Sequence, residues 1–209
     1  MMKAFIYALI TTAFLCACGK KSPNRVDLFN GKDLTGWIYI TNPDDSIPAD
    51  DTFTTSDGII HISGQPFGYM RTTETFKDYT LYLEYRWAGN EKADGGIFNR
   101  LQGEDHVWPR DAVQFQMRPD DYGYIFSGYP VDGIDGQGLY KKPNINTEDP
   151  ERPIGEWNNV EISCKGKQIT IKVNGTLVNE ANIDATEGHI GMQSEGGPID
   201  IRNIYIIPE

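Results

Sequence analysis

The sequence is poor in cysteine, histidine and basic charge, and each shortage excludes a class of protein. Three cysteines are too few for a disulfide-stapled fold, and they occur at Cys16, Cys18 and Cys164. The histidines are too far apart for a zinc-ligand spacing, and they occur at His61, His106 and His189. The formal net charge of -11 argues against nucleic acid and anionic membrane surfaces as partners. We therefore expect a neutral or cationic ligand.

The first residues are typical of an export signal. A basic start is followed by an apolar run over residues 4–15, which is too short to span a bilayer. Leu15-Cys16-Ala17-Cys18 then resembles the lipobox at which bacterial signal peptidase cuts before a cysteine that becomes acylated. An ordinary cleaved secretory signal is the alternative.

This pattern predicts a lipoprotein signal peptide over residues 1–17 and a lipid on Cys18, followed by a linker over residues 18–25. The protein is then exported and anchored in the cell envelope, on the periplasmic side or at the cell surface. It contacts the outer or cytoplasmic membrane through the lipid alone. Cys164 is the one cysteine that is neither removed with the signal nor acylated. It lies in an apolar strand, so we expect an inert residue of the core and not a nucleophile.

Helical periodicity is missing as well. From residue 26 onward no window keeps an apolar period of 3.6 over three turns, and 22 glycines and 12 prolines interrupt the chain. Short alternating runs instead predict strands, at residues 37–40, 58–63, 68–71, 80–87, 95–100, 112–118, 157–165, 168–174, 176–181, 189–193 and 199–207. We expect one all-β sandwich or jelly roll over residues 26–209.

Two segments between these runs have their own chemistry. Asn174-Gly175 suits the two left-handed positions of a type I′ turn, so residues 168–178 predict a hairpin. Residues 120–149 are rich in Gly, Pro, Asp and Tyr and predict a long loop that forms the wall of a binding site. The DGIDG sequence at residues 132–136 is explained by turn chemistry, because a calcium loop of the EF-hand type needs a longer ligand series.

The polar sides of several strands carry more charged and amide side chains than solvation requires. Side chains at i and i+2 share a face, so Leu81 and Leu83 point to one side of their strand and Glu84 and Arg86 to the other. Continued into neighbouring strands, this parity predicts one polar face, formed by Glu84, Arg86, Phe98, Arg100, Gln114, Gln116, Gln193 and Glu195. Such groups bind hydroxyls in pairs. The alternative is an ordinary solvated sheet surface.

Four segments resemble the 3-keto-disaccharide hydrolase family over nearly the whole mature chain. They are DLFNGKDLTGW at residues 27–37, GGIFNR at 95–100, WNNVEI at 157–162 and GHIGMQSEGGPIDIRNI at 188–204. The resemblance implies a concanavalin-like β-sandwich of two antiparallel sheets, with a concave face that binds a carbohydrate. It also implies a hydrolase for sugars whose carbon 3 is a ketone, which acidifies the hydrogen at carbon 2. A base removes that hydrogen, the oxygen at carbon 1 leaves, and water then adds.

The resemblance also implies roles for particular residues. Glu195 and Glu84 are the expected base and acid, and Arg100 and Arg86 the clamps for the enolate and hydroxyl oxygens, beside Gln116 and Gln193. Where many members of the family carry Glu, this chain has Gln114, which cannot act as a base.

The loop at residues 103–109 provides two further candidates. Trp108 is the expected stacking platform for a sugar ring. His106 is a candidate proton carrier, or a ligand of a divalent metal ion together with nearby carboxylates, and simple solvation of its ring is the alternative. No cofactor is required by any other pattern.

Two other functions stay open on the sequence. One is a carbohydrate-binding lipoprotein without catalysis. The other is a laminarinase-like glycoside hydrolase, although the E-x-D-x-x-E run that such enzymes commonly use is missing from the sequence.

Overall fold

The computed structural model describes residues 24–131, 139–142 and 150–209. The predicted signal peptide, Cys18 and most of the predicted linker therefore lie outside the described residues. So do residues 132–138, with the DGIDG sequence, and residues 143–149 of the predicted long loop. No helix in the described part of the chain is long and apolar enough to cross a membrane.

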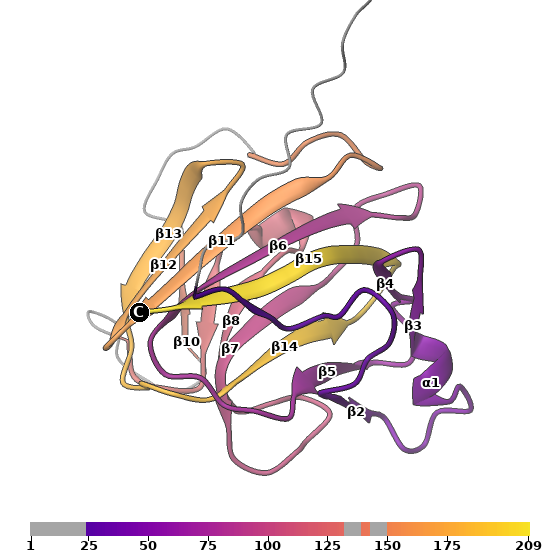
Figure 1. Cartoon of the computed structure of the whole chain (residues 1–209), viewed down its shortest axis with the longest axis horizontal. Helices are drawn as coiled ribbons and strands as arrows, with labels where there is room; N and C mark the ends of the chain where they lie inside the picture. The colour runs from indigo at the N-terminus through magenta and orange to yellow at the C-terminus, as the bar shows by residue number, and fades with distance from the viewer. Residues whose placement is uncertain (1–23, 132–138, 143–149) are drawn as a thin grey trace, which may run out of the picture.

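The fold is a sandwich of two antiparallel sheets (Figure 1). Sheet A has the order β13-β12-β11-β6-β15-β4-β3, with β1 paired to β15. Its strands are β1 (Val26–Asp27), β3 (Phe53–Ser56), β4 (Ile59–Ile62), β6 (Tyr79–Trp87), β11 (Asn158–Lys165), β12 (Gln168–Val173), β13 (Thr176–Asn182) and β15 (Ile199–Pro208). The all-β prediction is confirmed.

Sheet B has the order β10-β9-β8-β7-β14-β5-β2. Its strands are β2 (Trp37–Thr41), β5 (Gly68–Thr72), β7 (Gly96–Gln102), β8 (Asp111–Gln116), β9 (Ile125–Ser127), β10 (Leu139–Lys141) and β14 (His189–Ser194). The described helices are one turn long, α1 (Ala49–Thr52) and the 3-10 turn η1 (Pro119–Asp121).

Every predicted strand is present, but four strands were not predicted. β1, β3, β9 and β10 have two to four residues each, which is too short for an alternating pattern to stand out. β9 and β10 lie within the predicted loop of residues 120–149 and extend sheet B beyond β8. That segment is therefore partly sheet.

The core lies between the two sheets and follows the predicted parity. In β6, Leu81, Leu83, Tyr85 and Trp87 are all at most 2% exposed. Together with the inward side chains of sheet B they form one apolar cluster, which is the main source of stability for a sandwich of this kind. Cys164 belongs to the same cluster, and burial raises the pKa of its thiol to about 11, which fits an unreactive core residue.

The predicted hairpin of residues 168–178 is confirmed. Asn174 and Gly175 have φ angles of 50° and 81°, as a type I′ turn requires, and Val173 pairs with Thr176 across it.

A bulge in β7 breaks the alternation at Arg100. The register with β8 shifts between Asn99 and Gln102, and Arg100 has a φ of 53°. Its side chain is fully buried and donates from Nη1 to the carbonyl oxygen of Ala185. The prediction that Arg100 shares a face with Phe98 was therefore wrong, because parity holds only while the backbone stays regular.

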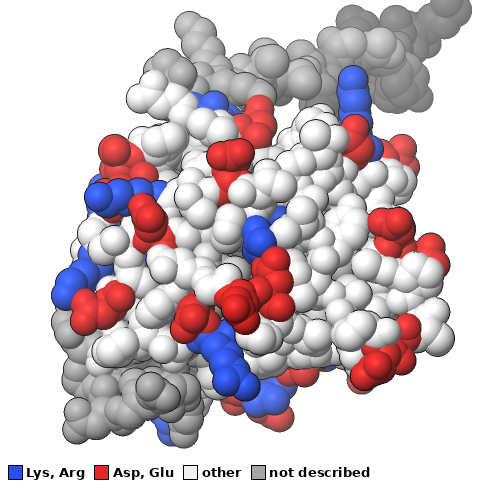
Figure 2. Space-filling model, turned by 90° about the horizontal axis from the view of Figure 1, so that it is seen from below, with Lys and Arg blue, Asp and Glu red and all other residues white. Residues whose placement is uncertain are grey.

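Figure 2 shows acidic and basic side chains interspersed over one face of the molecule, with broad neutral areas between them.

Gly128 lies where β9 ends and its backbone touches that of Arg110. A Cβ atom at this position would lie 1.5 Å from the carbonyl oxygen of Arg110, so the backbone would have to move. We expect Gly128→Ala to lower the free energy of unfolding by about 2 kcal/mol or more, measured by urea denaturation. Gly89→Ala is the matched control, because its Cβ would make only ordinary contacts, with the Pro198 ring at 3.4 Å and the Glu91 carbonyl oxygen at 3.8 Å. Equal urea midpoints for the two variants would contradict this account.

Candidate functional site

The predicted polar face is divided between the two sheets. Glu84 and Arg86 lie on β6 of sheet A, whereas Gln114 and Gln116 lie on β8 and Gln193 on β14, in sheet B. The polar side of each strand points away from the shared core, so these two groups lie on opposite sides of the sandwich. The prediction of one face was wrong, because parity gives the side of a strand but not the sheet that it joins.

On the outer face of sheet A, charged side chains of neighbouring strands pair with one another. The Glu84 carboxylate accepts hydrogen bonds from Arg202 Nε and from Asn203 Nδ2 at 2.9 Å. Arg86 Nε donates to Asp200 Oδ2 at 2.8 Å. The guanidinium carbons of Arg86 and Arg202 lie 4.6 and 3.9 Å from the centre of the Trp157 ring. Glu84 and Arg86 are thus held far from the polar groups of sheet B.

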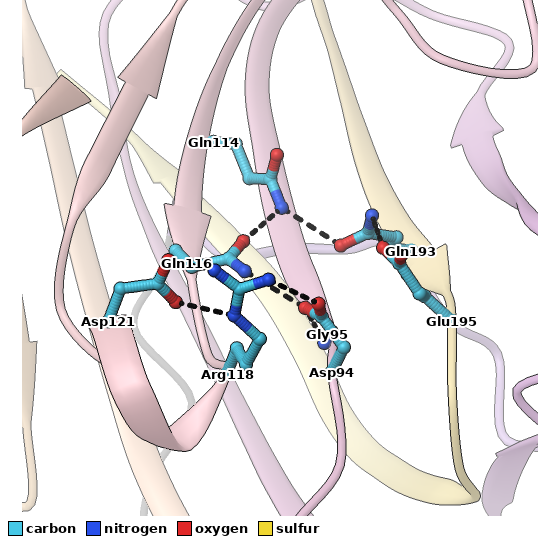
Figure 3. Close-up of polar contacts among 8 residues, drawn as sticks. All are labelled: Asp94, Gly95, Gln114, Gln116, Arg118, Asp121, Gln193 and Glu195. Carbon is cyan, nitrogen blue, oxygen red and sulfur yellow. Dashed lines mark hydrogen bonds and ion pairs between the residues drawn. The ribbon is translucent and has the colours of Figure 1, made fainter.

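On sheet B, three buried glutamines form a hydrogen-bonded row, which we call the glutamine array: Gln114, Gln116 and Gln193. Gln114 Nε2 donates to Gln116 Oε1 at 2.6 Å and to Gln193 Oε1 at 2.8 Å (Figure 3). Each of the three is at most 5% exposed. Buried amides are costly unless bonded, so these contacts explain how the sheet tolerates them.

Each end of the glutamine array donates to a carboxylate. Gln116 Nε2 donates to Asp94 Oδ1 at 2.9 Å, and Gln193 Nε2 donates to Glu195 Oε2 at 2.7 Å. Because a carboxylate only accepts, these two contacts fix the orientation of all three amides. Gln114 uses its nitrogen for both neighbours, and Figure 3 shows its oxygen pointing away from the cluster. That oxygen is available to accept a hydrogen bond from a ligand.

Burial raises the pKa of both carboxylates, and the charge of Asp94 raises that of Glu195 further. Burial raises the pKa of Glu195 to about 7, the charge of Asp94 adds to this rise, and Arg118 opposes it. Burial also raises the pKa of Asp94, against the nearby Arg118 and the Gly95 N–H. Arg118 Nη1 lies 3.6 Å from Asp94 Oδ2, and Arg118 is otherwise paired with Asp121. Near neutral pH, Glu195 can therefore both accept and donate a proton.

An aromatic cavity adjoins the glutamine array. It has a volume of about 470 Å³, and Gln114 lines it together with Phe98, Trp108 and Phe126. Trp108 is 48% exposed, and its ring stacks on Phe67 with centroids 5.6 Å apart and an interplanar angle of 6°. The cavity has the size and the mixed polar and aromatic lining of a small-ligand site. The structure thus brings Phe98 and Trp108 together with the glutamine array.

A bidentate ion pair fixes the loop that carries Trp108. Arg71 Nε and Nη2 each donate to a different oxygen of Asp105 at 2.8 Å. Two residues before Arg71 on β5, Tyr69 is fully buried. Burial and the charge of Asp105 raise the pKa of Tyr69 to about 12.

His106 lies apart from the cavity. Its ring is exposed, and its Nε2 lies 3.9 Å from a carboxylate oxygen of Glu104, itself exposed. In the described ranges, no group of three or more His, Cys, Asp or Glu side chains could hold a metal ion. The predicted metal at His106 therefore has no ligand set within those ranges.

Asp94 and Arg118 were not among the predicted site residues. Parity does place Arg118 on the same side of its strand as Gln114 and Gln116, because it lies two residues after Gln116. Asp94 lies in the loop before β7, where alternation gives no information, and only its contacts with Gln116 and Arg118 place it in the site.

The charges around Glu195 give a test of this geometry. We expect Asp94→Asn to lower the pKa of Glu195, because it removes a neighbouring negative charge, and Arg118→Gln to raise it, because it removes a positive one. Carbon-13 NMR titration of the Glu195 carboxyl measures both shifts. If both variants shifted the pKa of Glu195 in the same direction, these charges would not act on Glu195 as the geometry requires.

The comparisons with known proteins agree on the fold. Residues 24–207 match the family model described as the 3-keto-alpha-glucoside-1,2-lyase-like domain. No curated protein matches the sequence. A candidate glycosyl hydrolase from Parabacteroides distasonis ATCC 8503 has a TM-score of 0.63 and 18% identity, over 89% of this chain and 94% of that one.

Two further solved structures are similar. A beta-glucanase from Bacillus licheniformis has a TM-score of 0.57 and 15% identity, over 88% of this chain and 96% of that one. A carbohydrate binding module from Bacillus subtilis has a TM-score of 0.52 and 14% identity, over 81% and 93%. At such low identities, the likeness shows the fold alone, which is the predicted concanavalin-like jelly roll.

Proposed function

This chain belongs to the 3-keto-alpha-glucoside-1,2-lyase-like domain family, and we propose that it cleaves 3-keto-glycosides by elimination between carbons 1 and 2 followed by hydration. Family and fold together support the coarser statement, a glycoside hydrolase-like or carbohydrate-binding function. The finer proposal rests on one observation: a half-buried Glu195 with a pKa of about 7 lies on the same face as an aromatic cavity.

Glu195 is the group that moves the proton in this proposal. As a carboxylate it takes the hydrogen from carbon 2, and the electrons of that bond pass to the carbon-3 oxygen as an enolate. The enolate then forms the double bond between carbons 1 and 2, and the carbon 1–oxygen bond breaks. The leaving oxygen takes the proton from Glu195. Water next adds at carbon 1 and a proton at carbon 2, so the net reaction is hydrolysis.

The neighbouring groups favour this chemistry. Asp94 helps to keep the pKa of Glu195 near the working pH. Arg118 is a cation whose charge acts on both carboxylates, and it is suited to face the developing enolate oxygen. The glutamine array presents the free oxygen of Gln114 to a hydroxyl, and Trp108 offers an aromatic surface to a sugar ring.

The predicted base is tested by two isosteric variants. Glu195→Gln should lower kcat on a 3-keto-glucoside by about 100-fold or more, because the amide cannot accept the carbon-2 proton. Glu84→Gln is the matched control and should retain full turnover, because Glu84 bonds Arg202 on the opposite sheet. Product release is measured with the keto sugar and with its unoxidised parent, which should stay intact. Full turnover by Glu195→Gln would remove this residue from the reaction.

The role of Trp108 is separable from the proton transfer. Trp108→Ala should raise KM for a 3-keto-disaccharide about fivefold, since stacking contributes about 1 kcal/mol, and should leave kcat within about threefold. Trp108→Phe keeps an aromatic face and should stay close to the parent protein. Steady-state kinetics measures both constants. An unchanged KM in Trp108→Ala would place the sugar elsewhere.

Carbohydrate binding without catalysis is the second candidate. The observation that favours it is Gln114, since the centre of the array holds an amide and not a carboxylate. Calorimetric titration with the keto sugar and its parent decides between the two functions, because tight binding of either sugar without cleavage identifies a binding protein.

A further inference from the structure

Ser56, His61 and Asp200 form a hydrogen-bonded row on the outer face of sheet A, away from the glutamine array. His61 Nε2 lies 2.7 Å from Ser56 Oγ, and His61 Nδ1 lies 2.7 Å from Asp200 Oδ1. A serine, a histidine and an aspartate joined in this order are the groups of a hydrolytic triad, which is recognised by geometry and not by sequence position.

Strand pairing brings the three residues together. Ser56 is the last residue of β3, and the turn at Asp57 and Gly58 leads into β4, which carries His61. β15 pairs with β4 so that Asp200 lies directly opposite His61. Ser56 is two residues from Thr54, the direct partner of His61, and so lies on the same face as a diagonal neighbour.

The aspartate fixes the protonation pattern of the histidine. Asp200 is 5% exposed, and its other oxygen accepts from Arg86 Nε at 2.8 Å, so the carboxylate is held in place. Because a carboxylate only accepts, His61 Nδ1 carries the hydrogen of this contact. In the neutral ring, Nε2 is then the acceptor for the Ser56 hydroxyl, as general base catalysis requires.

The turn after Ser56 contributes polar hydrogens. Asp57 and Gly58 have φ angles of 51° and 76°. Within the described structure, their N–H groups make no backbone hydrogen bond outside the strand ladders. The N–H that directly follows a nucleophilic serine is a common oxyanion donor in hydrolases.

We propose that Ser56, His61 and Asp200 form an esterase site. Ser56 Oγ attacks the ester carbonyl while His61 Nε2 takes the hydroxyl proton. The carbon–oxygen bond of the ester then breaks, and the leaving alcohol takes that proton from His61. Water, activated by the same ring nitrogen, releases the acid from Ser56 and restores the enzyme.

The surroundings select the substrate class. Ser56 is exposed, and none of the three residues lines either of two described cavities, the one of about 470 Å³ on sheet B and one of about 700 Å³ on sheet A. An open site of this kind fits a short acyl group, such as an acetyl ester, and does not enclose a long acyl chain. The proposal does not depend on the function proposed for sheet B.

Active-site labelling of the full chain tests the proposal. A fluorophosphonate probe should form an adduct on the peptide that contains Ser56, identified by mass spectrometry, and Ser56→Ala should lose this adduct. Hydrolysis of p-nitrophenyl acetate should fall about 100-fold in Ser56→Ala and in His61→Gln, which removes the general base. Ser46→Ala, at another exposed serine, should keep the parent rate.

Asp200→Asn is unsuited as the main variant, because it leaves Arg86 without its carboxylate. Urea midpoints of Ser56→Ala and His61→Gln equal to the parent show that the loss is not caused by unfolding. The proposal is overturned if no adduct forms at Ser56, or if His61→Gln labels and hydrolyses as fast as the parent protein.

Discussion

Burial of alternate side chains between two sheets is the constraint on which this protein depends. Each strand contributes one apolar side to the core, and the two sets pack against one another without a disulfide in the described chain. The other side of every strand is thereby turned outward. Two separate outer surfaces result, and each carries its own arrangement of polar groups.

On sheet B the outward groups include a buried row of amides beside ion pairs such as Arg71 with Asp105. Three glutamines satisfy one another and donate to Asp94 and Glu195 at the ends of the row. A hydrogen-bonded row of this kind tolerates burial. The two carboxylates at its ends are therefore held near each other where few water molecules reach them. The raised pKa of Glu195 is a direct consequence. The site thus gains a proton carrier for neutral pH without a histidine.

On sheet A the outward groups are charges paired across strands. Arg202 neutralises Glu84, and Arg86 and His61 share the carboxylate of Asp200. Apart from the buried Asp200 carboxylate, these groups are partly exposed, and the pairs hold the side chains at defined distances. On this surface, Asp200, His61 and Ser56 follow one another in the order that the proposed esterase site requires.

The sequence alone was sufficient for most of the strands, the inward parity of the regular ones and the turn at Asn174 and Gly175, because these depend on residues that are close along the chain. The family resemblance, carried by four segments, was sufficient for the jelly roll, and the match over residues 24–207 confirms the family. Within the site, parity correctly grouped Gln114 and Gln116 with Phe98, since β7 and β8 pair in register at these positions.

The tertiary structure decided which sheet each strand joins, and this separated Glu84 and Arg86 from Glu195. It also placed the left-handed bulge that turns Arg100 into the core, and it brought the loop residue Asp94 beside Arg118. Alternation repeats along a single strand, whereas sheet membership, bulges and loop contacts depend on pairing between residues far apart in the chain. The sequence therefore determined the two sides of each strand, and only long-range pairing determined which polar sides meet.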